Sequence, residues 1–346
     1  MTLYLHCGYH KTASSYLQSC FASKKALLAK HGIFYPDDPR QVDSARGIPT
    51  AGNGAELAQA LLALNSRRAL EMLKDYARHA RCMGLGAVLL STEGFFSSFA
   101  REESLAMFAN LALQSGFQNV NAILFFRDPV EHAISVYCHR AASGKVPGFE
   151  EWIETRFETP ALMRSFARHC WSAPIKWQFE RFQPKIEKIE TVAFVRWLGI
   201  TEAIEFSNLP VQVNVSINVD ECELVRAFQA RHPGCGRYIS DAIKALCRGR
   251  QDEASFLRQD HELIAAAFFK RHLDVLDAVN RLLPVNQKLV LTERSRTISL
   301  SSASLFTIEQ SVACAQGLLD FRKSRTLRSR FSRFIRRAWL KCKGCF

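Results

Sequence analysis

The stretch TLYLHCGYHKTASS, residues 2–15, decides the fold that we predict for this chain. Residues 2–7 place an apolar side chain at every second position, as a buried strand does. Residues 8–12 then turn, and helical periodicity runs from residue 14 to residue 30. The segment therefore predicts a strand, a tight loop and a helix in direct succession.

The same alternation of strand and helix continues to about residue 143. Apolar runs at 87–91 and 120–126 predict two more buried strands. Helical spacing is found near 14–30, 55–64, 66–82, 102–114 and 129–143. Strands that alternate with helices indicate an α/β fold, a P-loop-like parallel sheet covered by helices.

The C-terminal half is predicted to be largely helical. The expected helices are 149–157, 161–169, 174–182, 219–231, 238–248, 260–282 and 306–320. Proline-containing stretches near 208–218 and 284–300 are expected to be loops or short extended pieces.

Composition and charge narrow the class of protein. The chain has 346 residues, is 48 % hydrophobic and carries a formal charge of +13. Ten Lys or Arg residues and no acids lie from Arg322 to the end, which leaves about +3 for the rest. Eleven cysteines, no leader-like start and no apolar run of about 20 residues predict free thiols in a cytoplasmic protein. The CxxC pair Cys342 and Cys345 has no further ligands nearby, so we expect no metal.

The loop after the first strand has the residues that a phosphate site needs. A loop before a helix N-terminus presents backbone N–H groups and the positive end of the helix dipole. Gly8 allows close approach, Lys11 supplies charge, and Thr12, Ser14 and Ser15 supply hydroxyls. The pattern is not GxxxxGK[ST], because only two residues separate Gly8 from Lys11. The alternative is a plain helix start with an exposed lysine.

A second candidate phosphate site follows the strand at 120–126. Arg127 offers a planar fork for bidentate phosphate binding, and Pro129 suits the first turn of a helix. Ser135 lies about two helical turns further on. The alternative reading is a capped helix start with a solvated serine.

Together the two motifs resemble those of PAPS-dependent sulfotransferases of the bacterial carbohydrate type (PAPS is 3'-phosphoadenosine 5'-phosphosulfate). HKTASSYLQ resembles their 5'-phosphosulfate loop, and RDPVEHAISVYCH resembles their 3'-phosphate motif in order and spacing. The resemblance covers roughly residues 1–145. This chain departs from the family at Ala13, where glycine is usual, at Ser14-Ser15, where threonines are usual, and at His132, where arginine is common.

The resemblance implies a donor site and a product, 3'-phosphoadenosine 5'-phosphate (PAP). The residues implied to hold the 5'-phosphosulfate are Gly8, Tyr9, His10, Lys11, Thr12, Ala13, Ser14 and Ser15. Arg127 and Ser135 would hold the 3'-phosphate.

Three residues are candidates for the chemistry of sulfuryl transfer. Lys11 is placed to stabilise the leaving phosphate. Glu93 follows the strand 87–91, at the end of a parallel strand where ligands bind, and is the preferred general base. His10 is the rival base, or else orients the loop. Glu93 could instead be a residue that simply starts the next helix.

These expectations define one sulfotransferase domain, 1–320, and a basic tail, 321–346. Within the domain, residues 1–145 form the PAPS-binding core and 146–320 a helical acceptor-side elaboration. The acceptor is a hydroxyl compound, a carbohydrate or glycan by family analogy. Residues 322–341 could form a basic amphipathic helix on an anionic membrane at the inner face, or a solvated tail; no specific nucleic acid is expected. The alternatives are a non-catalytic anion-binding or membrane-associated adaptor, and a nucleotide kinase.

Overall fold

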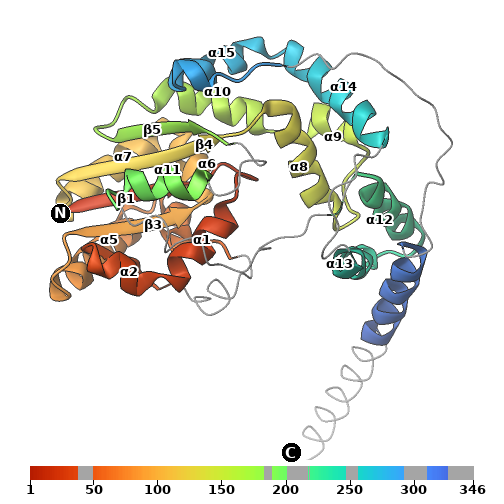
Figure 1. Ribbon diagram of the computed structural model, residues 1–346, viewed down its shortest axis with the longest axis horizontal. Helices are drawn as coiled ribbons and strands as arrows, with labels where there is room; N and C mark the ends of the chain where they lie inside the picture. The colour runs from red at the N-terminus through yellow and green to blue at the C-terminus, as the bar shows by residue number, and fades with distance from the viewer. Residues whose placement is uncertain are drawn as a thin grey trace, which may run out of the picture. The chain divides into compact units, whose positions relative to one another are not determined.

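Five parallel strands form a single sheet, in the order β2-β3-β1-β4-β5 (Figure 1). The structure is a computed structural model, and it describes residues 1–37, 50–182, 189–200, 217, 219–246, 256–291 and 310–325. The strands are β1 (Thr2–Cys7), β2 (Ile33–Phe34), β3 (Ala87–Thr92), β4 (Asn119–Phe126) and β5 (Lys176–Arg181). The prediction of an α/β fold with a parallel sheet flanked by helices is confirmed.

The first strand of the chain is the central strand of the sheet. β1 pairs with β3 on one side, where Cys7 is level with Thr92, and with β4 on the other. Because all three strands are parallel, their carboxyl ends open at the same edge of the sheet. The loops after these three strands are therefore neighbours.

Helices cover both faces of the sheet. On one face, the apolar side chains of β1, β3 and β4 pack in one core with α4 (Ala55–Leu62), α5 (Ser66–Cys82), α6 (Gly94–Phe99), α7 (Glu102–Gln114), α10 (Thr159–His169) and α15 (Leu273–Leu282). On the other face, a second core joins α1 (Ser14–Ser23), α2 (Lys25–Lys30) and α11 (Ile189–Trp197) to the alternate residues of the strands. Because each of these strands has a core on both faces, consecutive residues along it are apolar.

The helix predicted over 174–182 is wrong, because this segment contains the edge strand β5. Trp177 and Phe179 are buried, whereas Lys176, the first residue of β5, is exposed and Gln178 is half-buried. This period of two is expected of a strand with one covered face. The two aromatic rings stack at 5.6 Å. Pairing with β4 therefore prevails over the helical spacing read in this short segment.

Most other predicted helices are found with small shifts. The helix predicted over 14–30 divides at Lys24 into α1 and α2, and that over 260–282 divides into α14 (Phe256–Lys270) and α15. The remaining elements are α8 (Pro129–Ala141), α9 (Phe149–Thr155), α12 (Val219–Arg231), α13 (Gly236–Leu246), a short 3-10 turn at Val285–Gln287 and helical residues 310–325. Residues 326–346, which hold most of the predicted tail, lie outside the described residues.

The chain divides into two compact units. The sheet unit comprises Met1–Ala133, Arg156–Asn214 and Ala265–Glu293, and the helical unit comprises Ile134–Thr155, Val215–Ile264 and Arg294–Phe346. Both units draw on residues from each side of position 145, where the sequence analysis placed the end of a donor-binding core. In the part of the chain that the structure describes, no helix has the length and apolarity needed to cross a membrane.

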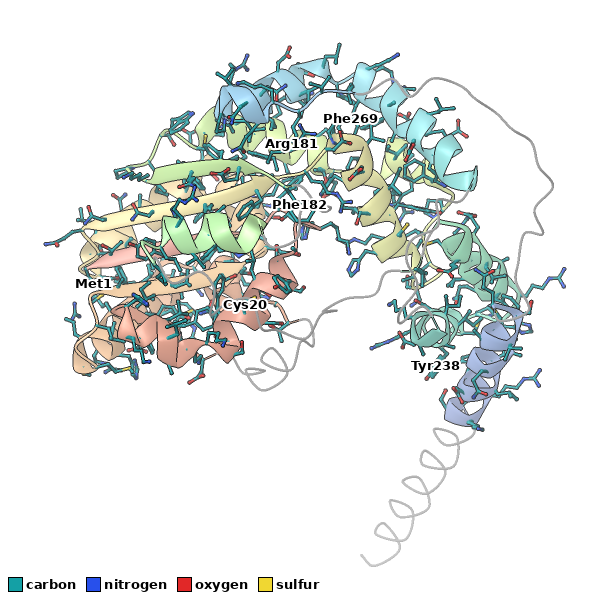
Figure 2. The ribbon with its side chains drawn as sticks, in the orientation of Figure 1. Met1, Cys20, Arg181, Phe182, Tyr238 and Phe269 are labelled. Atoms are coloured by element: carbon teal, nitrogen blue, oxygen red, sulfur yellow. The ribbon has the colours of Figure 1, made fainter. Side chains whose placement is uncertain are left out.

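The helical unit has an aromatic core of its own. The ring of Tyr137 packs on those of Phe149 and Trp152, at 5.1 and 5.5 Å between centroids, and its hydroxyl donates to Glu223 Oε1 at 2.7 Å. The helical residues 310–325 pack on α13, where Phe321 meets Tyr238 (Figure 2).

Candidate functional site

The predicted site residues of the sheet unit meet at the carboxyl edge of the sheet. The loop after β1 holds Gly8 to Ala13, β3 ends just before Glu93, and β4 ends just before Arg127. The N–H of Gly8 donates to the carbonyl of Thr92 at 3.0 Å, which ties the first two loops together at their base. Parallel pairing thus brings together residues that lie more than a hundred positions apart.

The loop after β1 contains two non-glycine residues in the left-handed region. Lys11 has φ 65° and Ala13 has φ 58° and ψ 20°. A left-handed conformation costs an L-residue about 1–2 kcal/mol, because Cβ crowds the following carbonyl. Such residues within a turn aim successive N–H groups at one concave side, the arrangement that binds anions. Ala13 occupies the position where left-handed backbone favours glycine.

The hydroxyls of this loop differ in what they bind. Thr12 is buried and its Oγ1 donates to the carbonyl of Tyr9 at 2.5 Å. Ser14, in the first turn of α1, is 2 % exposed; its Oγ makes no well-formed hydrogen bond among the described residues, and its closeness to Glu93 helps to lower the pKa of that carboxyl. Ser15 is half-buried. A buried hydroxyl without a well-formed hydrogen bond at a helix start is a position where an incoming anion gains a hydrogen bond.

Gly8 allows the loops after β1 and β3 to approach each other. A Cβ at this position would lie 2.7 Å from Ser14 Oγ and 2.8 Å from Glu93 Cγ. Because these distances are shorter than van der Waals contact, a larger residue would push the two loops apart.

His10 and Glu93 form a pair. His10 Nδ1 lies 2.7 Å from Glu93 Oε2, and the two side chains are 41 % and 35 % exposed. Burial by itself would raise the pKa of Glu93, but the hydrogen bond to His10 and the charges of His10 and Lys11 hold it below its usual value. Glu93 is therefore ionised near neutral pH, so Nδ1 of His10 carries the proton and donates it. The two residues predicted as rival bases are in contact.

Arg127 joins the second motif to the first. Its Nη1 donates to the carbonyl of Lys11 at 3.1 Å, and its Nη2 lies 3.3 Å from Glu131 Oε2. The guanidinium carbon stands 5.6 Å from the ring centroid of Phe182, which follows β5 (Figure 2). The arginine is thus held against the loop that the sequence analysis assigned to the other phosphate.

The helix that follows Arg127 starts with a side-chain cap. Asp128 Oδ1 accepts the N–H of Glu131 at 3.0 Å, and Pro129 is the first residue of α8. Ser135 also lies on α8, where it is half-buried, but it belongs to the helical unit.

Two buried histidines lie beneath the loops and were not predicted as site residues. His132 is fully buried and stacks on Tyr9 at 4.1 Å, with Tyr9 Oη 3.1 Å from its Nδ1. The ring of Tyr9 consequently belongs to the core, although Tyr9 was implied to bind the donor. His6 Nδ1 lies 2.8 Å from Ser91 Oγ and joins β1 to β3. Both pKa values are lowered, chiefly by burial, that of His6 to about 4.

Comparison with known proteins adds no relative. No protein-family model matches the chain, and neither the curated proteins nor the solved structures contain a match.

Proposed function

We propose that the chain is a sulfotransferase that moves the sulfuryl group of PAPS to a hydroxyl of an acceptor. The observation that carries the proposal is the 3.1 Å hydrogen bond from Arg127 to the carbonyl of Lys11. It joins the two motifs on which the family resemblance depends, at the sheet edge where ligands of parallel α/β folds bind. In this proposal the sheet with its strand–loop–helix is P-loop-like.

The loop after β1 is the proposed site of the 5'-phosphosulfate. Lys11 and Ala13 hold the backbone in a turn suited to an anion, and α1 adds the positive end of its dipole. The hydroxyl of Ser14 supplies a hydrogen bond from a buried position. Thr12 and Ser15 complete the set, and Lys11 stabilises the charge that develops on the bridging oxygen.

Arg127 is the proposed ligand of the 3'-phosphate, and Ser135 remains a candidate for the same role. The guanidinium of Arg127 is largely buried, with 15 % of the side chain exposed, and is restrained at two of its nitrogens. A preorganised planar fork suits a phosphate better than a mobile ammonium group does.

For proton removal we propose His10 as the base, oriented by Glu93. Because Nδ1 donates to the carboxylate, Nε2 is left to accept the proton of the acceptor hydroxyl. The acceptor oxygen forms its bond to sulfur as the bond from sulfur to the bridging oxygen breaks, and PAP leaves. Glu93 stabilises the imidazolium that results. This reverses our order of preference from sequence, in which Glu93 was the base.

The acceptor proposed from the family analogy is a carbohydrate or glycan, and the proposed location is the cytoplasm. Binding of the basic tail to the inner face of a membrane stays a prediction, since residues 326–346 lie outside the described residues.

Calorimetric binding of PAP, without magnesium and with ADP as the comparison, tests the proposal. We expect PAP to bind more tightly than ADP, because ADP lacks the 3'-phosphate that Arg127 would meet. Arg127→Ala should lose at least about tenfold in PAP affinity and most of this preference, since charge-assisted pairs with phosphate contribute about 1.5–3 kcal/mol. Lys11→Ala should lower the affinity for both PAP and ADP.

Arg78→Ala and Lys30→Ala are matched controls, because both residues are exposed near the C-terminal ends of helices α5 and α2, which lead to the amino ends of β3 and β2. Neither should change the affinity of PAP. Equal or absent binding of PAP and ADP to the wild-type chain would overturn the proposal. PAP binding without turnover of PAPS on any hydroxyl acceptor would instead favour the adaptor.

A further inference from the structure

The ion pair between Arg127 and Glu131 places an acid beside the group that would bind phosphate. Arg127 Nη2 and Glu131 Oε2 are 3.3 Å apart, and the two side chains are only 15 % and 27 % exposed. Charges in such a position are screened less by salt and water than charges on an open surface.

An acid at the start of a helix is common, but a role in starting α8 does not explain why Glu131 contacts Arg127. An acid in the first turn of a helix is favoured by the helix dipole. In a capping box, the side chain of the third helical residue turns back to the N–H of the capping residue. Here Asp128 caps the N–H of Glu131, whereas the carboxylate of Glu131 meets the guanidinium of Arg127. The side chain thus acts on the arginine.

Glu131 has two opposite effects on Arg127. As a hydrogen-bond acceptor it holds Nη2 in place, while the carbonyl of Lys11 holds Nη1. As an anion it offsets the positive charge, and a phosphate that binds the same guanidinium comes close to a second negative group. The first effect needs only an oxygen, and the second needs the charge.

We propose that Glu131 is an internal counter-ion of Arg127, which competes with the donor's 3'-phosphate and so sets the affinity and anion selectivity of the site. This inference rests on the proposed function. A weakly bound monoanion gains little by displacing the carboxylate. A nucleotide already anchored at the loop after β1 can bring a dianionic phosphate against it.

The substitution Glu131→Gln separates the two effects, because the amide keeps an oxygen acceptor for Nη2 and removes the charge. We expect PAP to bind about tenfold more tightly in calorimetry, the size of effect produced by one nearby charge in a half-buried site. ADP affinity should stay unchanged, since ADP has no group at Arg127. Glu131→Asp, which keeps the charge, should give no gain.

Glu71→Gln is the matched control, because Glu71 pairs with an arginine four residues before it, Arg67, at 3.1 Å. This pair is on α5, and its side chains are 92 % (Arg67) and 52 % (Glu71) exposed. The substitution should leave PAP affinity unchanged. Glu131→Ala provides a second neutral variant should the glutamine variant fold poorly, and should also bind PAP more tightly than the wild type, by a smaller factor.

If the neutral variants bind PAP no more tightly than the wild type, while the wild type still prefers PAP to ADP, the counter-ion role of Glu131 is contradicted and the proposed function is not. A wild type that does not prefer PAP would overturn the proposed function, and this inference with it.

Discussion

The loops after β1 and β3 end at the same sheet edge but contribute to it in different ways. The first holds Lys11 and Ala13 in left-handed conformations and leads into the first turn of α1. The second has ordinary backbone: Glu93 has φ −70° and ψ −21°, and α6 begins at the next residue. The loop after β1 therefore contributes both its main chain and side chains, His10 and Lys11 among them, whereas the loop after β3 contributes the side chain of Glu93.

In the proposed function, the loop after β1 would bind the donor and carry the base His10, and the loop after β3 would orient that base through Glu93. Most substitutions leave main-chain N–H groups in place, so an anion site built from them would tolerate Ala13, Ser14 and Ser15 where the sulfotransferases that the sequence resembles hold other residues. A carboxylate that orients a histidine has no such substitute.

The largest effect is expected at the pair of His10 and Glu93. His10→Asn should lower the turnover of PAPS about 10³-fold, because general base catalysis contributes 10²–10⁴-fold, and should change PAP affinity little. Glu93→Gln should lower turnover by a smaller factor, since it removes orientation and charge but leaves the base. Single-turnover rates with saturating PAPS measure both.

The order of these two losses decides which residue is the base. A larger loss in Glu93→Gln than in His10→Asn would restore Glu93 to that role. His79→Asn, at an exposed histidine on α5, should leave the rate unchanged.

A smaller effect, on the stability of the fold in acid, is expected from His6, which joins the two strands beneath the loops. The pKa of His6 falls to about 4 when the chain folds, from about 6.5 in the unfolded chain. Between these values the unfolded state binds more protons, so the free energy of unfolding decreases as pH falls from 6.5 to 4 and this contribution levels off below 4. The loss that His6 causes is roughly 3 kcal/mol.

Urea unfolding at pH 7 and pH 4 tests this contribution. His6→Asn, which can still bond to Ser91, should lose less stability between the two values than the wild type does. The same loss in both chains would contradict the assignment. His79→Asn is again the control and should follow the wild type.

The smallest effect is expected at Ala13. Ala13→Gly removes a left-handed strain of about 1–2 kcal/mol and adds an entropic cost of folding of about 0.5–1 kcal/mol, so the free energy of unfolding should rise by up to about 1.5 kcal/mol. Ala109→Gly, inside α7, should instead lose about 1 kcal/mol. Urea unfolding measures both, and a loss of stability at both positions would show that residue 13 is not strained.

Strands buried on both faces were predictable from sequence, whereas edge strands were not. β1, β3 and β4 are apolar at nearly every position because helices cover both sides, and this signal is strong. β2 has two residues, and β5 buries only alternate side chains in a segment that also fits a helix. Their pairing depends on β3 and β4, which a local pattern does not contain.

The site shows the same limit. Gly8, Lys11, Glu93 and Arg127 each stood out by residue type and by their place after a strand. Their contacts could not be predicted in this way, because a contact between residues 10 and 93 depends on the order of the strands in the sheet. The pairing of Arg127 with Glu131 is local, since the two residues are four positions apart, but Arg127 lies before the start of α8, so helical spacing does not predict this contact either.

The central position of β1 has a consequence for synthesis. The ribosome makes β1 before both of its neighbours, since β3 begins at residue 87 and β4 at residue 119. Translation at about 5–20 residues per second leaves Leu3 and Leu5 without their final partners for several seconds. During that interval the nascent chain exposes an aggregation-prone apolar segment whose backbone groups are unpaired on both sides. A chaperone that binds such segments near the exit tunnel would have a target at the very residues that later support the candidate site.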